Sequence, residues 1–246
     1  MRRARAALAA LAIGTMIAIP TAVEAAPTCF GAPTTGSDIT GATIVGTSGQ
    51  DLIVGTPQND VIFGMCGDDW IYGEGGRDKI CENDGNAHEI DGEGGNDWIN
   101  SGPGNDLLVQ GGAGNDVIKG STGNDQLGGS DAVATDCSEP ADPTLTGADN
   151  LDGGPGNDVI TGSGTSDVMT GGDGIDSLVG MRGGDRMMGG TGPDCVLGGM
   201  GGDVMKGEGG HDDLFAMDGY IVDSVAGGTG FDACSVDPVD KVASCP

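Results

Sequence analysis

Residues 153–180 read GGPGNDVITGSGTSDVMTGGDGIDSLVG, and an aspartate returns in them at every ninth position. The flanking sequence keeps this spacing, so that eight aspartates follow one another at intervals of nine from Asp149 to Asp212. Neither helical nor simple strand periodicity produces a period of nine. A fixed period of this kind indicates a repeat architecture, which has to be settled before any other feature is interpreted.

Placing the aspartate at position six gives units of the form Gly-Gly-x-Gly-x-Asp-x-aliphatic-x. Sixteen such units carry the aspartate, and they are interrupted by the degenerate stretch ENDGNAHEID (82–91), by one extra residue, Gln110, and by a non-repetitive segment. The predicted organisation is a signal peptide (1–25), an N-terminal cap (26–45), a first array (46–128), an insertion loop (129–148), a second array (149–235) and a C-terminal capping tail (236–246).

Position eight is always aliphatic or methionine, whereas positions seven and nine vary freely. A three-residue strand that alternates outward, inward and outward fits this pattern, because side chains alternate across a strand with a period of two. The predicted inward residues are Ile53, Ile62, Ile71, Ile80, Ile99, Leu108, Ile118, Leu127, Ile160, Met169, Leu178, Met187, Val196, Met205 and Leu214.

The composition is strongly acidic and poor in aromatic residues. The formal net charge is −28, 51 residues are glycine, and 31 aspartates stand against 7 glutamates. A merely solvated acidic surface would use both carboxylates, so the preference for the shorter side chain indicates ligands held close to a tight turn. The charge disfavours nucleic acids and anionic membrane surfaces as partners, since both would be repelled, and it favours cations.

The repeated motif, as in GGAGND and GEGGND, resembles the hemolysin-type, or repeats-in-toxin, calcium-binding family. The resemblance covers most of residues 46–235. It implies an all-β fold, a parallel β-roll in which each nonapeptide forms a turn and a short strand, two nonapeptides complete one coil, and calcium ions lie between turns. The two arrays would form such a roll on either side of the insertion loop.

Calcium suits this motif because Ca²⁺ takes six to eight oxygen ligands from carboxylates, carbonyls or water, and because glycine adopts the sharp turn conformations easily. Carboxylates that share an ion should lie 18 residues apart, in two rows, which gives roughly eight to ten Ca²⁺ ions for the chain. The predicted metal ligands are Asp51, Asp60, Asp69, Asp78, Asp97, Asp106, Asp116, Asp125, Asp149, Asp158, Asp167, Asp176, Asp185, Asp194, Asp203, Asp212 and Asp232.

Arginines at positions 2, 3 and 5 precede an apolar run over residues 6–19 and small residues near position 25. This pattern is typical of a cleaved secretory signal. The run of 14 is shorter than the roughly 20 residues of a membrane-spanning helix. The sequence therefore predicts a secreted, extracellular protein without stable membrane insertion.

Seven cysteines follow the predicted signal, and disulfides are the normal state of cysteine in an exported protein. Cys234 and Cys245 bracket the tail and could fix it over the last coil. Cys66 and Cys81 are a second predicted pair. Because seven is odd, at least one thiol stays free or pairs between molecules.

No catalytic machinery is predicted. His88 and His211 are the only histidines, the HEIDG stretch lacks the second histidine of a zinc-protease motif, and there is no Gly-x-Ser-x-Gly motif. The non-repetitive segments are too short for a catalytic domain. We therefore expect a calcium-binding protein rather than an enzyme.

Two alternatives stay open at this stage. One is an extracellular adhesion or surface-binding scaffold, with ice binding less favoured because threonine does not recur in an unbroken row beside the recurring asparagine of position five. The other is a toxin-related module or an accessory module of a secreted hydrolase.

Overall fold

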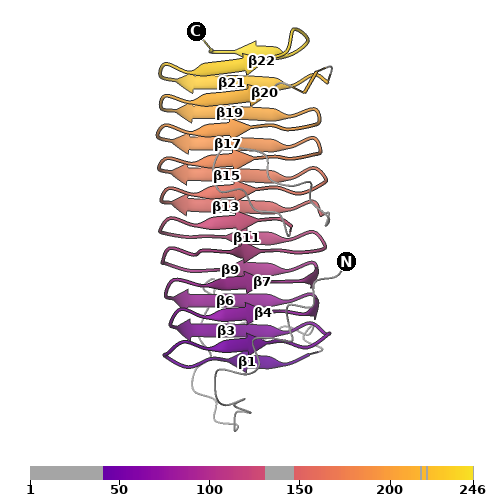
Figure 1. The fold of residues 1–246 in the computed structure, drawn as a ribbon, viewed down its shortest axis with the longest axis vertical. Coiled ribbons are helices and arrows are strands. Elements are labelled where there is room, and N and C mark those ends of the chain that lie inside the picture. The colour runs from indigo at the N-terminus through magenta and orange to yellow at the C-terminus, as the bar shows by residue number, and fades with distance from the viewer. Residues whose placement is uncertain (1–40, 131–146, 217, 220, 246) are drawn as a thin grey trace.

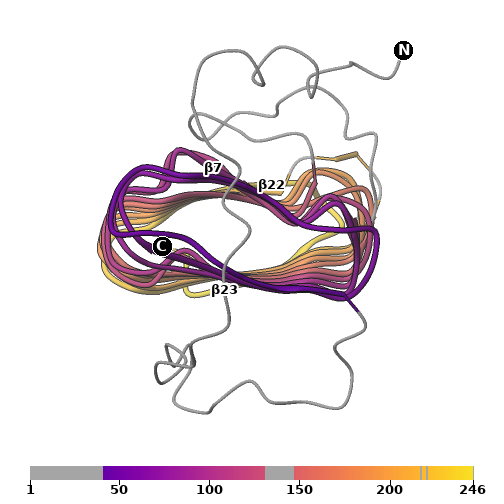
Figure 2. The same ribbon diagram turned by 90° about the horizontal axis from the view of Figure 1, so that it is seen from below.

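In the computed structural model, residues 41–130, 147–216, 218–219 and 221–245 are described, and they stack into one long roll of flattened coils (Figure 1). The predicted signal peptide and most of the N-terminal cap lie outside these residues. Each coil contributes one short strand to each broad face, as the end view in Figure 2 shows. No helix with the length and apolarity needed to cross a membrane occurs in the described part of the chain.

Both faces are parallel sheets in which alternate strands pair. The 11-stranded sheet contains β1 (Thr43–Val45), β3 (Val61–Cys66), β6 (Lys79–Asp84), β9 (Trp98–Asn100), β11 (Val117–Lys119), β13 (Asn150–Pro155), β15 (Val168–Asp173), β17 (Arg186–Thr191), β19 (Val204–Gly209), β21 (Ser224–Thr229) and β23 (Lys241–Ala243).

The opposite sheet has ten strands, and a two-stranded sheet joins neighbouring turns. The ten are β2 (Leu52–Val54), β4 (Trp70–Tyr72), β7 (Glu89–Asp91), β10 (Val109–Gln110), β12 (Gln126–Gly128), β14 (Val159–Thr161), β16 (Ser177–Val179), β18 (Cys195–Leu197), β20 (Asp213–Ala216) and β22 (Ala233–Val236), and the short pair is β5 (Gly75–Gly76) with β8 (Gly94–Gly95).

The register confirms the predicted all-β parallel β-roll. In regular coils each residue pairs with the residue 18 positions later, as Ile160 does with Leu178 and Met169 with Met187. The inward residues form one continuous apolar cluster from Ile53 to Val225, in which almost every side chain is fully buried. With only one such residue per strand, the core is a single narrow file, and parallel backbone pairing supplies the remaining cohesion.

The prediction for Leu108 was wrong. Val109, not Leu108, is fully buried, and it pairs with Ile90 and Leu127 in the inward file. The reason is that the two units 82–91 and 101–110 each contain ten residues, and the additional residue lies before the strand rather than after it. Leu107 is consequently pushed outward and is 56% exposed.

The expectation that only position eight would be buried also needs correction. Val61, Phe63 and Cys81 form a second buried cluster, and Val179 packs with Met181 in a third. These side chains belong to positions seven, nine and two of adjacent coils. Parallel pairing places the same repeat position of successive coils side by side. Apolar residues on the outer surface of the sheet can therefore bury one another as well.

The two arrays join in one uninterrupted roll. β11 pairs directly with β13, with Ile118 opposite Leu151, although these residues are 33 positions apart. Gly129 and Ser130 begin a turn that Gly147 resumes at position four, since a methyl group on Gly147 would meet the Gly114 carbonyl oxygen of the previous coil at 1.3 Å. The strands on either side of this turn therefore keep the register of the repeat.

The turns use glycine for two separate reasons. Position four has positive φ and stacks closely; at Gly114, for example, φ is 141° and an added methyl group would meet the Gly95 carbonyl oxygen at 1.4 Å. Position two also has positive φ in most units but accepts other residues, such as Glu74. The first glycine has no such φ requirement and is needed for space, as the candidate site shows.

The disulfide predictions had mixed outcomes. Cys234 and Cys245 are bonded, as predicted for the tail. The pairing of Cys66 with Cys81 was wrong, because Cys66 is an exposed free thiol and Cys81 is disulfide-bonded. The strand register explains this, since Cys81 lies opposite Phe63 and Cys66 lies opposite Asp84.

Candidate metal centre

The position-six aspartates form two rows, one beside each sheet, and hydrogen bonds connect the members of each row. The backbone N–H of one aspartate donates to Oδ1 of the aspartate one coil further along, as from Asp167 to Asp185 at 2.9 Å. The first row contains Asp60, Asp78, Asp97, Asp116, Asp149, Asp167, Asp185, Asp203 and Asp223.

The second row runs beside the opposite sheet and has one gap. It contains Asp51, Asp69, Asp106, Asp125, Asp158, Asp176, Asp194, Asp212 and Asp232, with Ala87 in the position between Asp69 and Asp106. The structure thus brings all seventeen predicted site residues into the two expected rows. The pairs separated by 19 residues, Asp97 with Asp116 and Asp106 with Asp125, are joined in the same way as the others.

The second carboxylate oxygen of most of these aspartates is buried and has no hydrogen-bond partner within the described residues. These unpartnered Oδ2 atoms belong to Asp69, Asp78, Asp97, Asp106, Asp116, Asp125, Asp149, Asp158, Asp176, Asp185, Asp194, Asp203, Asp212, Asp223 and Asp232. A buried carboxylate oxygen without a donor is costly, so a repeated array of them indicates that a positively charged partner belongs there.

The position-one glycine shows where such a partner would fit. A methyl group on Gly180 would meet Asp185 Oδ2 at 2.5 Å and the Gly198 carbonyl oxygen at 2.3 Å. Two acceptor oxygens from successive coils therefore converge on the same side of one glycine. Carboxylate and carbonyl oxygens are the ligands that calcium prefers, and only glycine leaves room for them at this position.

Three units differ in a way that the sequence analysis missed. At Asp51, Asp60 and Asp167 the N–H of the position-two residue donates to Oδ2, from Thr47, Thr56 and Ser163 respectively. None of these three position-two residues has the positive φ of most other units. A positive φ is unfavourable for the β-branched residues Thr47 and Thr56. A threonine or serine after the first glycine is not a sufficient signal, because Ser121 at the same position has a φ of 82° and Asp125 Oδ2 in its unit is unpartnered. In the three units a backbone donor competes with a cation.

Burial raises the carboxyl pKa values of most members of both rows. It raises the pKa of Asp97, Asp149 and Asp185 to about 8, and repulsion from neighbouring aspartates of the same row contributes. The same burial raises the pKa to about 7 for Asp125, Asp158 and Asp194, and to about 6 for Asp69, Asp78, Asp116, Asp167, Asp176 and Asp203. Without a cation, burial therefore shifts these carboxyls towards the protonated, neutral form.

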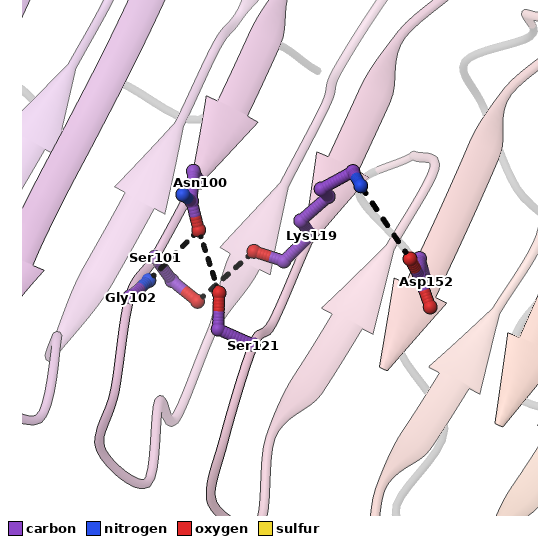
Figure 3. Close-up of polar contacts among 6 residues, drawn as sticks. All are labelled: Asn100, Ser101, Gly102, Lys119, Ser121 and Asp152. Carbon is purple, nitrogen blue, oxygen red and sulfur yellow. Dashed lines mark hydrogen bonds and ion pairs between the residues drawn. The ribbon is translucent and has the colours of Figure 1, made fainter. Parts of the chain in front are cut away.

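Basic side chains do not neutralise the rows. One ion pair occurs among the described residues, Lys119 Nζ with Asp152 Oδ2 at 3.7 Å, and both side chains are nearly half exposed on the outside of the sheet (Figure 3). Next to it, the Ser101 hydroxyl donates to the Lys119 carbonyl oxygen at 3.4 Å, and the Ser121 hydroxyl donates to Asn100 Oδ1 at 2.9 Å. This cluster is a structural network of neutral groups beside one exposed ion pair.

Carboxylates alone do not complete a metal site. No group of three or more His, Cys, Asp or Glu side chains with metal-binding geometry occurs within the described ranges. Each candidate position offers carboxylate oxygens of its row together with backbone carbonyl oxygens of the turns. This donor set fits a hard cation such as Ca²⁺, which accepts carbonyl oxygens, and it does not fit a metal that requires nitrogen or sulfur.

Asp223 is a site residue that the sequence analysis did not identify. It accepts a hydrogen bond from the Asp203 N–H at 2.7 Å, and its Oδ2 is buried without a partner. Its unit, DGYIVDSVA (218–226), keeps glycine only at position two. The signal that remains is the aspartate followed two residues later by Val225, which lies in the inward file.

The recurring asparagine of position five has an internal role. Its side-chain oxygen accepts a hydrogen bond from the position-five N–H of the next coil, as between Asn105 Oδ1 and the Asn124 N–H at 2.8 Å. The histidines take part in ring stacking, His88 on Trp70 and His211 on Phe231. Neither the asparagine row nor the histidines add a ligand to the two aspartate rows.

Comparison with known families gives one result. The model for the RTX calcium-binding nonapeptide repeat (4 copies) matches residues 45–80, 89–108, 108–131, 144–178 and 179–219, which is more than half of the chain. No curated protein matches the chain at a significant level.

Proposed function

Since the chain belongs to the RTX calcium-binding nonapeptide repeat family, we propose that it is a secreted protein that binds several Ca²⁺ ions along its two aspartate rows and that its folding is coupled to this binding. The repeats of this family are generally structural and calcium-binding rather than catalytic. The position-six aspartates of both rows and the position-one carbonyl oxygens would hold the ions.

One observation carries the proposal: buried Oδ2 atoms without a donor recur in coil after coil. A bound divalent cation supplies positive charge to these oxygens. The protein supplies the rest, because the hydrogen bond from the preceding aspartate N–H fixes Oδ1 and thereby aims Oδ2 at the position-one glycine, as at Asp185 and Gly180.

Coupling to folding follows from the small core. One inward side chain per strand buries little apolar area, while every coil brings two more carboxylates into the rows. Repulsion within the rows and the cost of burying charge oppose folding of the ion-free chain. A cation that binds only the folded state stabilises that state by mass action.

Secretion is supported by the N-terminal sequence pattern and by the extracellular occurrence that is typical of these repeats. Extracellular calcium modules bind with Kd values of about 10⁻⁴ to 10⁻³ M, which keeps such a chain ion-free in a calcium-poor cytosol. The roll would then form mainly after export.

Calcium titration calorimetry on the chain without residues 1–25, combined with circular dichroism, tests the proposal. We expect roughly eight to ten bound ions and a strand signal that appears on calcium addition and disappears with a chelator. Magnesium at the same concentration serves as the control cation. A strand signal that is the same with calcium and with excess chelator, or a stoichiometry of one or none, would contradict the proposal.

A further inference from the structure

Glu82 departs from the repeat in the same unit that lacks the position-six aspartate. In the unit 82–91, Glu82 stands at position one, where most units have glycine, and Ala87 stands at position six. The family model matches residues 45–80 and resumes at 89, so most of this unit, residues 82–88, lies outside the match. The row beside the second sheet is interrupted here, because Ala87 offers no carboxylate between Asp69 and Asp106.

The Glu82 side chain is fully buried in β6, and neither of its carboxylate oxygens has a hydrogen-bond partner among the described residues. The Oδ2 atom of Asp69, which is also fully buried, is unpartnered as well. The two Glu82 oxygens and Asp69 Oδ2 are thus buried together without a donor, while Asp69 Oδ1 accepts from the Asp51 N–H at 2.8 Å. Burial raises the pKa of Glu82 to about 8, the Asp69 carboxylate beside it adds to the rise, and the Asp69 backbone N–H, which faces the Glu82 carboxylate, partly offsets it.

The position-one glycine of the previous coil shows how close the two carboxylates are. A methyl group on Gly64 would meet Glu82 Oε2 at 2.2 Å and Asp69 Oδ2 at 2.8 Å. At the corresponding place in the other row, a methyl group on Gly73 would meet Asp78 Oδ2 at 2.6 Å and the Gly92 carbonyl oxygen at 2.8 Å. The Glu82 carboxylate therefore lies where a backbone carbonyl oxygen lies in a regular unit.

We propose that Asp69 and Glu82 together hold one divalent cation, so that Glu82 supplies the carboxylate that Ala87 lacks. This inference rests on the proposed function. Glutamate is longer than aspartate by one methylene group, and this length lets it reach the row from position one. Relative to a regular unit, this unit gains a carboxylate at position one, where Glu82 replaces glycine, and loses one at position six, where Ala87 replaces aspartate.

The first test is calcium stoichiometry by calorimetry on the full chain after signal removal. We expect Glu82→Gln and Glu82→Gly each to bind one ion fewer than the wild-type protein. The double variant Glu82→Gly with Ala87→Asp rebuilds a regular unit, and it should recover the wild-type stoichiometry. Asp84→Asn is the matched control, because it removes an exposed carboxylate from the same turn and should leave the count unchanged.

A second measurement reports on the location directly. The chain has two tryptophans, Trp70 and Trp98, and Trp70 follows Asp69 in the sequence. In a Trp98→Phe background, terbium bound between Asp69 and Glu82 is sensitised by Trp70. Glu82→Gln should lower this emission, while Asp84→Asn should not.

The outcomes separate the two proposals. If Glu82→Gln retains the wild-type ion count and terbium emission, Glu82 is not a ligand, although the rest of the roll still binds calcium. If Glu82→Gly loses an ion but the Ala87→Asp addition does not restore it, the compensation is refuted. If the wild-type protein binds no calcium, the proposed function itself fails.

Discussion

The backbone N–H of Asp167 donates to Oδ1 of Asp185 at 2.9 Å, and the Asp185 N–H donates in turn to Oδ1 of Asp203 at 2.8 Å. Each aspartate is therefore both a member of the backbone ladder and a candidate ligand. The two carboxylate oxygens have different roles, since Oδ1 connects coils and Oδ2 is left for a cation. A substitution that changes only one of the two oxygens can separate these roles.

Asp185→Asn is such a substitution. The amide keeps an oxygen that can accept the Asp167 N–H, and it places an NH₂ group where Oδ2 lies beside the Gly198 carbonyl oxygen. We expect it to lower calcium affinity while stabilising the calcium-free roll by about 1–2 kcal/mol, because a buried donor now meets a buried acceptor. Calorimetry measures the affinity, and urea unfolding of chelator-treated protein at about pH 5, where the raised carboxyl pKa values favour the ion-free roll, measures the stability.

Asp213→Asn is the control, because Asp213 is exposed on the outside of β20 and belongs to neither row. It should change neither quantity measurably. Equal behaviour of the two variants would contradict the division of roles between Oδ1 and Oδ2.

The two rows could be predicted because the period of nine shows which residues of successive coils lie on top of one another. Aspartates 18 residues apart, such as Asp149 and Asp167, are adjacent whenever two units complete a coil. The join between Asp116 and Asp149 could not be predicted, because the insertion lies inside a turn and the strands on either side keep their register. A gap in the repeat therefore did not mean a gap in the roll.

Other features depend on backbone details that a period does not contain. Leu107 points outward because the ten-residue unit 101–110 accommodates its extra residue before the strand. The repeat pattern fits a position before the strand and a position after it equally well, so the sequence does not decide between them. The hydrogen bond from the Thr56 N–H to Asp60 depends on the φ angle at position two. The closeness of Glu82 to Asp69 could not be predicted, because the unit 82–91 lacks both the position-one glycine and the position-six aspartate of the repeat.

Gly114→Ala tests whether position four sets the spacing between coils. The φ angle of 141° is unfavourable for alanine, and the methyl group would meet the Gly95 carbonyl oxygen at 1.4 Å. We expect a loss of more than about 3 kcal/mol in the free energy of unfolding in calcium, because both strain and overlap oppose the substitution. Urea unfolding followed by circular dichroism measures this.

Gly209→Ala is the matched control for that measurement. Its nearest neighbour to an added methyl group is Thr229 Oγ1 at 3.5 Å, which is ordinary contact. The change should stay within about 0.5 kcal/mol. Similar losses for Gly114→Ala and Gly209→Ala would show that close stacking at position four is not what matters.

The disulfide between Cys234 and Cys245 closes a loop of 11 residues at the C-terminal end of the roll. Replacing both cysteines by serine should destabilise the last coil by about 2–3 kcal/mol, in keeping with the entropy of closing a short loop. Hydrogen exchange should then show faster exchange in β22 and β23 than in the central strands. Alkylation of the free, exposed Cys66 is the control and should leave exchange unchanged; uniform acceleration along the whole roll would argue against a local cap.

The raised pKa values predict an unusual pH dependence for protein kept metal-free with a chelating resin. Burial raises the pKa of Asp97, Asp149 and Asp185 from 3.8 to about 8, so between these pH values the folded chain binds more protons than the unfolded chain. Stability from these groups is fully present below about pH 4 and is lost as pH rises towards 8. We expect the metal-free protein, which lacks the strand signal at neutral pH, to form a urea-resistant roll as the pH is lowered towards 5, and its urea midpoint to fall as the pH rises towards 8.

With saturating calcium the same experiment should give the opposite trend, because the ion binds the deprotonated carboxylates and competes with protons. Asp185→Asn removes one titrating group, so its metal-free form should lose less stability over this pH range than the wild-type protein. A metal-free midpoint that rises with pH would mean that the carboxylates are ionised in the folded roll without a cation, and the assignment of Oδ2 as a cation ligand would lose its electrostatic basis.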